Sequence, residues 1–375
     1  MKEFKYDILI SEDDVCNRKQ EMATLLKAAQ KNKRIVLLAP RRYGKTSLIK
    51  NVISSKVRET QPKKLIIFVD LMEVESLSSI AERIEYGVTK ALAKSPNITN
   101  LIKIIANVFK NIALQIDVDA LTGLPSLVFK KNSANDKKNL AAILDGICSL
   151  AEKQPIVLIL DEFQDIAFIP EAQGIFRATL QQITNSAIFI LGSKRHIMEE
   201  MLNKNTAPLF HFGDEMHLGP IAEEEWLPYF AERLEPKKVS LNREALHYLC
   251  ERMCQVPNAI CEIGAWIQEQ YYNKQLNTND IEQTLNNMVE CKQSYAYRLQ
   301  NFSGKEKIFL QAIAKLNFVT QPHSLEFLKT VNIPKSSVGK LLKKFTDHGI
   351  IEMELTKGWR LSDPVFAHYL RRTII

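Results

Sequence analysis

The chain has 375 residues, of which 46% are hydrophobic and 25% charged, and its formal net charge at pH 7 is +7. This composition is ordinary for a soluble globular protein and excludes a disordered chain or a fibrous repeat. No apolar run is long enough to span a bilayer, and the N-terminus lacks the apolar core of a signal peptide, so we expect a cytoplasmic protein without a membrane partner.

Apolar runs alternate with helical patterns in the first part of the chain. The expected strands are 34–39, 64–70, 155–161, 187–192 and 215–218, and the helices between them include 18–30, 45–56, 77–93 and 139–152. Near-continuous apolar strands separated by helices are typical of a parallel sheet covered on both faces. We therefore predict an α/β domain over residues 1–219, with a hairpin inserted at about 112–130.

Helices take over from about residue 220, where the strands stop. Helical spacing at 223–233, 243–254, 259–270 and 280–300, the last with Thr278 and Asn279 as its N-cap, predicts a helical domain over 220–302. The pattern in 303–375 is three helices (305–316, 324–330 and 336–348) followed by two strands (350–355 and 359–362), which predicts a winged helix. Cys250, Cys254 and Cys261 share a helical face but lack zinc-site spacing, so we interpret them as buried thiols.

The first expected strand ends in a loop that carries the main chemical signal. Its sequence is Ala39-Pro40-Arg41-Arg42-Tyr43-Gly44-Lys45-Thr46-Ser47, and a helix follows. Backbone N–H groups of such a loop and the positive helix N-terminus bind phosphate. Lys45 suits the β- and γ-phosphate oxygens and the Thr46 hydroxyl suits Mg²⁺. The loop therefore predicts a site for ATP or ADP with Mg²⁺.

Two carboxylates end the strand at 155–161. We expect Asp161 to hold Mg²⁺ through water, and Glu162 to orient and deprotonate an attacking water. Ser193 follows the strand at 187–192, where it either senses the γ-phosphate or caps the next helix; the sequence leaves both open.

On these residues the chain resembles the archaeal-type P-loop ATPases, which are related to STAND signalling ATPases and to origin-recognition-type AAA+ ATPases. The matching blocks are Asn17-Arg18, Pro40 to Leu48, Leu160-Asp161-Glu162-Phe163, Leu191-Gly192-Ser193 and Val256-Pro257. The resemblance implies an ASCE/AAA+-like parallel sheet, a helical lid and a winged-helix domain. It also implies that Arg18 and Pro257 lie near the adenine.

The expected site residues follow from the loop and the resemblance together. Catalysis is assigned to Glu162, Lys45 and Ser193, and Mg²⁺ binding to Thr46 and Asp161. The expected nucleotide-binding residues are Pro40, Arg41, Arg42, Tyr43, Gly44, Lys45, Thr46, Ser47, Arg18 and Pro257.

The expected third helix of the winged helix is basic. Ser336, Ser337, Lys340, Lys343 and Lys344 are candidates for contacting double-stranded DNA, and Lys357, Arg360, Arg371 and Arg372 extend the basic set. The alternative is that these lysines form a solvated face on a winged helix that acts as an intramolecular latch.

Three functions agree with these features. The first is a nucleotide-controlled switch with slow Mg²⁺-dependent ATP hydrolysis and a winged-helix output domain. The second is a DNA-binding ATPase of the origin-recognition or loader type, and the third is a scaffold that holds ATP or ADP without hydrolysing it. Each leaves room for a protein partner or self-assembly.

Overall fold

The structure is a computed structural model that describes residues 2–95, 98–108, 114–118, 125–129, 135–354 and 357–373. The chain forms two compact units. One unit is Leu9–Gly219, and the other joins the residues up to Ile8 with those from Pro220 onward. Within the described ranges, no helix combines the length and the apolar character needed to cross a membrane.

A five-stranded parallel sheet forms the centre of the first unit, in the order β2-β5-β6-β1-β7. The strands are β1 (Arg34–Leu38), β2 (Leu65–Asp70), β5 (Ile156–Asp161), β6 (Ala187–Gly192) and β7 (Asp214–His217). The parallel α/β sheet predicted from the sequence is confirmed. Because β6 lies between β1 and β5, the sheet has the additional strand that defines the ASCE type of P-loop fold.

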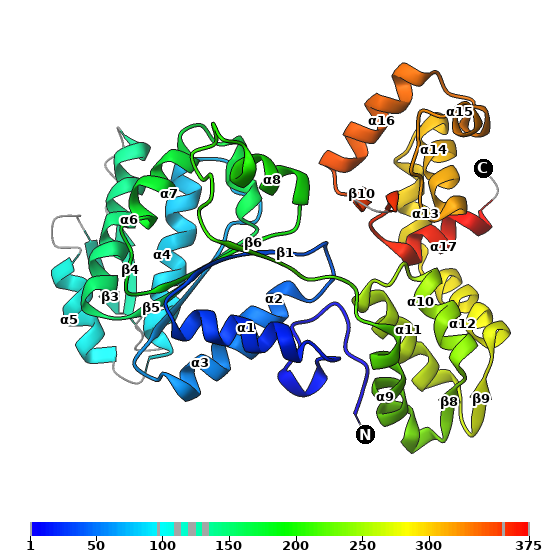
Figure 1. Cartoon of the computed structure of the whole chain (residues 1–375), viewed down its shortest axis with the longest axis horizontal. Coiled ribbons are helices and arrows are strands. Elements are labelled where there is room, and N and C mark those ends of the chain that lie inside the picture. The colour runs from blue at the N-terminus through cyan, green and yellow to red at the C-terminus, as the bar shows by residue number, and fades with distance from the viewer. Residues whose placement is uncertain are drawn as a thin grey trace. The chain divides into compact units, whose positions relative to one another are not determined.

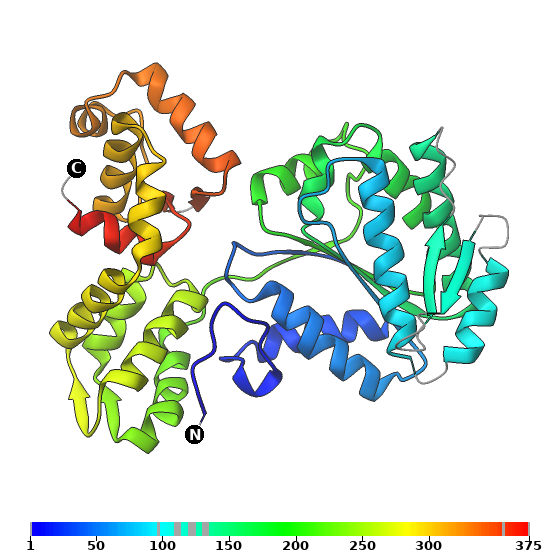
Figure 2. The same ribbon diagram turned by 180° about the vertical axis from the view of Figure 1, so that it is seen from behind.

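Helices cover both faces of this sheet (Figures 1 and 2). One face carries α1 (Lys19–Gln30) and the long helix formed by α2 (Lys45–Ser47), a π-helical segment η2 (Leu48–Ile53) and α3 (Ser54–Thr60). The other face carries α4 (Leu77–Ala93), α6 (Asp136–Lys153), α7 (Ala172–Leu180) and α8 (Arg195–Asn203), with a short 3-10 segment η3 (Phe163–Phe168) between β5 and α7. All residues of β5 and β6 are buried, which explains their near-continuous apolar sequences.

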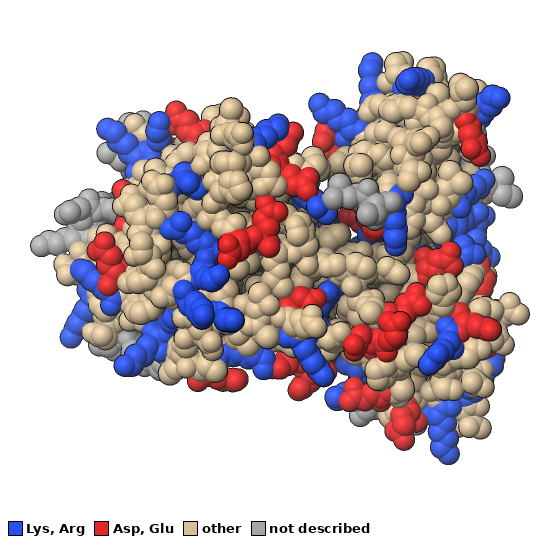
Figure 3. Space-filling model, in the orientation of Figure 1, with Lys and Arg blue, Asp and Glu red and all other residues tan. Residues whose placement is uncertain are grey.

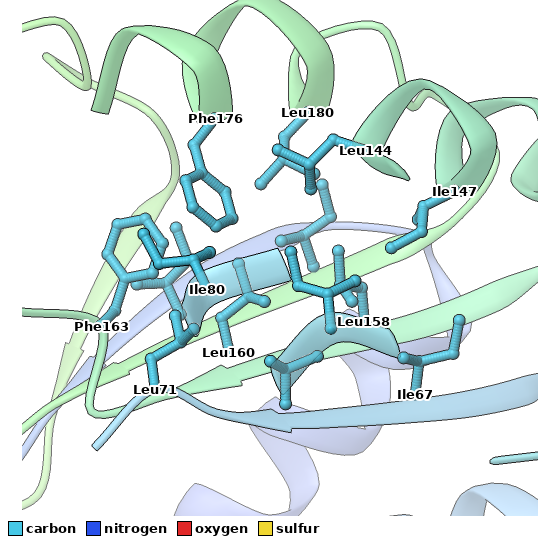
Figure 4. Close-up of a cluster of buried hydrophobic side chains, with 14 of the residues drawn as sticks. Ile67, Leu71, Ile80, Leu144, Ile147, Leu158, Leu160, Phe163, Phe176 and Leu180 are labelled. Carbon is cyan, nitrogen blue, oxygen red and sulfur yellow. The ribbon is translucent and has the colours of Figure 1, made fainter. Parts of the chain in front are cut away.

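Side chains from alternate strand positions build the core on the α4–α6–α7 face (Figure 4). Leu158 and Leu160 point to this face, where they meet helix residues such as Leu144 and Phe176. Each fully buried aliphatic or aromatic side chain contributes about 1.5–3 kcal/mol, so this cluster holds the strand ends that carry the site.

An insertion separates α4 from α6. It contains α5 (Ile98–Val108) and the antiparallel pair β3 (Leu114–Val118) and β4 (Pro125–Phe129), in the region where the sequence predicts a hairpin, beside α4 (Figure 2). The turn that joins the two strands lies outside the described residues.

The second unit begins with the N-terminal residues, although the sequence predicts them in the first domain. Phe4 is buried against Tyr229 and Phe230. Its ring lies so close to Gly264 that a Cβ there would approach it to 2.4 Å, so only glycine fits. Arg233, fully buried, donates to the backbone oxygen of Glu3. These contacts tie residues 2–8 to the helical part of the chain.

The helical part consists of α9 (Glu223–Leu234), η4 (Glu235–Lys237), α10 (Arg243–Arg252), α11 (Pro257–Gln270), α12 (Thr278–Cys291) and α13 (Gln293–Gln300). Three expectations were wrong here. A parallel pair, β8 (Val239–Leu241) and β9 (Lys274–Leu276), interrupts the helices. The single helix expected over 280–300 breaks at Lys292, and its N-cap is Asn277, whose side chain accepts from the backbone N–H groups of Asn279 and Asp280.

The chain ends in a winged helix. It contains α14 (Gly304–Leu316), α15 (Leu325–Val331), α16 (Lys335–Asp347), the antiparallel strands β10 (Ile351–Glu354) and β11 (Gly358–Leu361), and α17 (Pro364–Arg372). A bridge between Val319 and Trp359 adds a third strand position. Gly358 has φ +96°, and a Cβ there would lie 2.4 Å from the oxygen of Val319, so glycine is required on both grounds.

Candidate functional site

The phosphate-loop sequence connects β1 to α2. Its first residue, Ala39, donates its backbone N–H to the oxygen of Gly192 at 3.2 Å, which fixes the start of the loop to β6. Positive φ angles occur in the loop at Arg42 (67°) and Gly44 (80°) and not at Ala39. Phosphate loops commonly have glycine at this position, and alanine occupies it here without backbone strain. Arg41 and Arg42 are exposed.

Lys45 lies at the centre of a cluster of charged side chains. Its Nζ is 2.9 Å from Oδ1 of Asp161 and 2.9 Å from Oε1 of Glu162. The side chains of Lys45 and Asp161 are 5% and 4% exposed, and that of Glu162 is 20% exposed. Lys45 is therefore bound to two carboxylates in a largely buried site, where electrostatic attraction is stronger than in water.

Thr46 completes this cluster, because its hydroxyl donates to Oδ2 of Asp161 at 2.7 Å. Mg²⁺ prefers oxygen ligands and retains several waters, so one hydroxyl and one carboxylate side by side fit this ion. The part of the chain that the structure describes contains no group of three or more His, Cys, Asp or Glu side chains suited to a metal. Cys250, Cys254 and Cys261 are buried free thiols as expected, but they do not share a helical face, because Cys250 lies on α10, Cys261 on α11 and Cys254 between the two helices. Burial raises the pKa of Cys250 to about 12.

The second carboxylate oxygen of Glu162 has its own partners. Oε2 accepts from the hydroxyl of Ser193 at 2.7 Å and from Nε2 of Gln164 at 2.6 Å. Ser193 is thus not the cap of α8, whose N-cap residue is Lys194. Sequence reasoning missed Gln164. The available signal was a pair of polar residues, Gln164 and Asp165, between the apolar residues Phe163 and Ile166.

The charges in the cluster support one another. Burial raises the pKa of Glu162, but the nearby charge of Lys45 and the hydrogen bonds from Ser193, Lys45 and Gln164 outweigh it, so the pKa lies below its ordinary value. Burial lowers the pKa of Lys45, but Asp161 and Glu162 outweigh that effect and raise it. The cation and the glutamate are therefore both held in their charged forms.

Two of the expected nucleotide-binding residues contact the segments that lead out of this unit. The hydroxyl of Ser47 accepts from the backbone N–H of Ile10 at 3.3 Å. Arg18 is buried, with φ 71°, and its guanidinium donates to Glu21 at 2.9 Å and to the oxygen of Gly219 at 2.6 Å. Pro257, the first residue of α11, belongs to the other unit, so its role beside the adenine stays a prediction.

The basic residues of the winged helix divide into exposed and structural ones. Ser336, Lys340 and Lys343 on α16 are exposed and Ser337 is half-buried. Lys344 is also exposed, but its ammonium group pairs with the buried Glu306 at 2.6 Å. The grouping of Arg360 and Arg371 with this surface was wrong. Arg360 is fully buried and pairs with Glu354 at 2.6 Å, and Arg371 bonds the backbone oxygen of Ala314.

Comparison with known proteins agrees with this architecture. Residues 293–372 match a family described as a probable winged helix domain. The Walker-type ATPase PABY2304 of Pyrococcus abyssi superposes with a TM-score of 0.64 at 17% identity, over 98% of this chain and 99% of that one. The ORC2 protein of Aeropyrum pernix, in ADPNP–ADP complexes, gives a TM-score of 0.52 at 15% identity, over 98% and 95% of the two chains.

A search of curated protein sequences finds no significant match. The structural similarities, at these low identities, establish the fold. The chain has the α/β fold of the P-loop ATPases, as seen in archaeal Walker-type and ORC proteins, followed by a winged-helix domain at its C-terminal end.

Proposed function

We propose that this protein is a P-loop ATPase that binds ATP with Mg²⁺ and acts as a nucleotide-controlled switch with slow hydrolysis. The observation that carries the proposal is the pairing of Lys45 with Asp161 and Glu162 at the carboxyl ends of the strands. Incoming phosphates are anions that replace the carboxylates as partners of Lys45. The archaeal ORC2 structure with adenine nucleotides supports the choice of ligand.

The chemistry assigned to each residue follows from its atoms. The loop from Pro40 to Gly44 supplies backbone N–H groups, and Lys45 neutralises charge on the β- and γ-phosphates. Thr46 and Asp161 would hold Mg²⁺, which would supply further neutralisation of phosphate charge. Glu162 accepts a proton from the attacking water. In the nucleotide-free protein, Lys45, Ser193 and Gln164 hold the pKa of Glu162 below its ordinary value.

The connections between the two units favour a switch. The chain passes from one unit to the other at Ile8–Leu9 and at Gly219–Pro220. Next to the first crossing, the backbone of Ile10 is bonded by Ser47 (3.3 Å) and by Asn51 (3.0 Å), both on the helix that follows the phosphate loop. Next to the second, Arg18 holds Gly219.

Asn51 belongs to the π-helical segment η2, a type of helix that is frequent at functional sites and differs from an α-helix in its hydrogen-bond spacing. When nucleotide binding changes the contacts of Lys45 or Thr46, a shift of this helix therefore moves Ser47 and Asn51 and with them Ile10. From there it reaches residues 2–8, which Phe4 anchors to the helical part of the second unit. The helical part and the winged helix share that unit, so they form the output together.

The test is a titration of ATP with Mg²⁺ into the wild type, Lys45→Ala and Lys50→Ala. Lys50 lies on the same helix and contacts the ring of Phe68 rather than the carboxylates, so it is the matched control. We expect Lys45→Ala to abolish binding and Lys50→Ala to leave the dissociation constant within about twofold. Normal ATP affinity in Lys45→Ala would refute the proposal.

DNA binding is a second candidate, which the surface of α16 favours. Lys335, Lys340 and Lys343 are exposed, and residues 335–346 contain no acidic side chain. Figure 3 shows Lys and Arg side chains projecting from the part of the winged helix where Figure 1 places α15 and α16. Exposed lysines on this helix suit the phosphates of a duplex. If the protein does not bind duplex DNA at low salt, the remaining role for the winged helix is that of an intramolecular latch.

The third candidate function is a scaffold that holds nucleotide without hydrolysing it. Measuring hydrolysis in wild type and Glu162→Gln distinguishes this scaffold from the switch. The switch requires hydrolysis that this substitution removes, whereas a scaffold shows the same background in both proteins. Measuring turnover across protein concentration tests whether a partner or a second copy contributes to the site.

A further inference from the structure

Gln164 is a buried polar side chain next to the Lys45 cluster. It is 1% exposed and lies on η3 between Phe163 and Ile166, both of which belong to the hydrophobic core. A buried amide is stable only when its donors and acceptor are bonded. Its bonding partners therefore show which groups it holds in place.

The hydrogen bonds of this amide reach Asp165 on η3 and the residues that follow β5 and β6. Its Nε2 donates to Oε2 of Glu162 at 2.6 Å and to Oδ1 of Asp165 at 3.2 Å, and its Oε1 accepts from the backbone N–H of Ser193 at 3.1 Å. The reversed amide would set an oxygen against two carboxylates and an NH₂ group against an N–H donor. The orientation is therefore fixed by its neighbours.

The consequence for Glu162 is that its two oxygens have different partners. Oε2 is held by Gln164 and by Ser193, which itself is fixed by Gln164 through its backbone. Oε1 has Lys45 as its partner. When phosphates replace Glu162 as the partner of Lys45, Oε1 loses its bond to Lys45, while Oε2 keeps its bonds from Gln164 and Ser193.

We propose that Gln164 is a positioning residue, which with Ser193 holds Glu162 by Oε2 and leaves Oε1 to receive the proton of the attacking water. This inference rests on the proposed ATPase function. In the reaction, the water oxygen bonds to the γ-phosphorus, the bond from that phosphorus to the β–γ bridging oxygen breaks, and ADP leaves with the electron pair. The water proton goes to Oε1 of Glu162.

The benefit of such a holder is geometric. A free glutamate samples many rotamers, and a misplacement of about 1 Å in a reacting group can lower the rate about 100-fold. Gln164 restricts Glu162 before the substrate arrives, and it also fixes Ser193, the other donor to the same oxygen. Because Gln164 bonds neither Lys45 nor Thr46, this role predicts a change in turnover without a change in nucleotide affinity.

The experiment compares two substitutions at this position. Gln164→Leu keeps a branched side chain without adding charge, and it removes both the donor that faces Glu162 and the acceptor that faces Ser193. Gln164→Met removes both interactions at similar length, so at least one variant remains informative if the other fails to fold. The control is Ser186→Ala at the opposite end of β6, where the hydroxyl of this buried serine accepts from the backbone N–H of Ile156 at 3.0 Å.

The measurements are the ATP dissociation constant and the single-turnover rate. We expect both Gln164 variants to hydrolyse at least about tenfold more slowly than the wild type, with a dissociation constant within twofold, and Ser186→Ala to keep its rate. In a Glu162→Gln background, Gln164→Met should change the residual hydrolysis rate less than twofold, because the general base that Gln164 positions is then absent.

Three results on the variants would overturn the inference. They are wild-type turnover in both Gln164 variants, a rise in dissociation constant that matches the fall in rate, and an undiminished effect of Gln164→Met in the Glu162→Gln background. A wild type that binds ATP but never hydrolyses it also overturns the inference, while leaving nucleotide binding intact. A wild type that fails to bind ATP refutes the proposed function itself, which the titration reports separately.

Discussion

Replacing Lys45 with methionine should destabilise the nucleotide-free first unit, because Lys45 is the partner of two carboxylates. In the wild type its Nζ lies 2.9 Å from both Asp161 and Glu162. The substitution keeps the aliphatic part of the side chain and removes the charge. Asp161, with a side chain 4% exposed, is then left close to Glu162 without the intervening cation.

Removing one partner of a buried ion pair costs about 3–5 kcal/mol. Glu162 is partly reached by water, with a side chain 20% exposed, so we take the lower end, about 3 kcal/mol. For a unit of this size, that loss corresponds to a fall of about 6–12 °C in the midpoint of thermal unfolding.

The loss should depend on pH. The folded-state pKa of Glu162 lies below its ordinary value of 4.5, so its contribution to wild-type stability is present above pH 4.5 and disappears as the pH falls through the folded pKa. The pKa of Lys45 is raised from 10.5, so its contribution is present below pH 10.5 and disappears as the pH rises through the folded pKa. The difference between wild type and Lys45→Met should therefore be largest near neutral pH and shrink in acid.

Hydrogen exchange of the β1 and β5 amides measures this stability in the unit concerned. All three tryptophans belong to the other unit, so tryptophan fluorescence should be the same in wild type and Lys45→Met; they are Trp226, Trp266 and Trp359. The control is Lys33→Met, which breaks an ion pair to Asp214 whose side chains are 54% and 68% exposed, and such surface pairs contribute at most about 1 kcal/mol. Equal effects of the two substitutions at pH 7 would refute the reasoning about the cluster.

Two further predictions concern the connection between the units and the winged helix. Gly264→Ala places a Cβ 2.4 Å from the ring of Phe4, so the N-terminal segment should lose its protection from hydrogen exchange. Nucleotide-induced changes in the second unit should then weaken, while ATP affinity is retained. Unchanged protection of residues 2–7 would contradict this prediction. Replacing Lys340 and Lys343 together by Ala should lower the slope of log affinity for duplex DNA against log salt by about 2, whereas the equally charged change at the exposed Lys27 and Lys31 should leave it unaltered. Equal slopes in the two double variants would exclude α16 as the DNA surface.

Much of the first unit could be predicted from local sequence. The phosphate loop follows a buried strand and precedes a helix, and Asp161 and Glu162 follow a second buried strand. In a parallel sheet the carboxyl ends of strands meet at one edge, so these motifs were expected to converge. The structure brings Lys45, Asp161 and Glu162 within hydrogen-bond distance.

The features that were missed depend on contacts distant in sequence or on very short elements. Phe4 packs on residues of α9 and beside Gly264, and nothing in the first eight residues indicates that partner. The strands β8 and β9 have three residues each, too few for a recognisable alternation. Arg360 was counted as surface charge, because a sequence does not reveal that Glu352 and Glu354 pair with it in the interior.

Single-turnover hydrolysis of ATP with Mg²⁺ by wild type and Glu162→Gln tests the central claim most directly. It should be measured across protein concentration, with and without duplex DNA. We expect slow but measurable hydrolysis by the wild type, and bound ATP that persists in Glu162→Gln with a rate at least about 100-fold lower. Equal rates in the two proteins would contradict the assignment of Glu162 as the base and with it the nucleotide-timed switch.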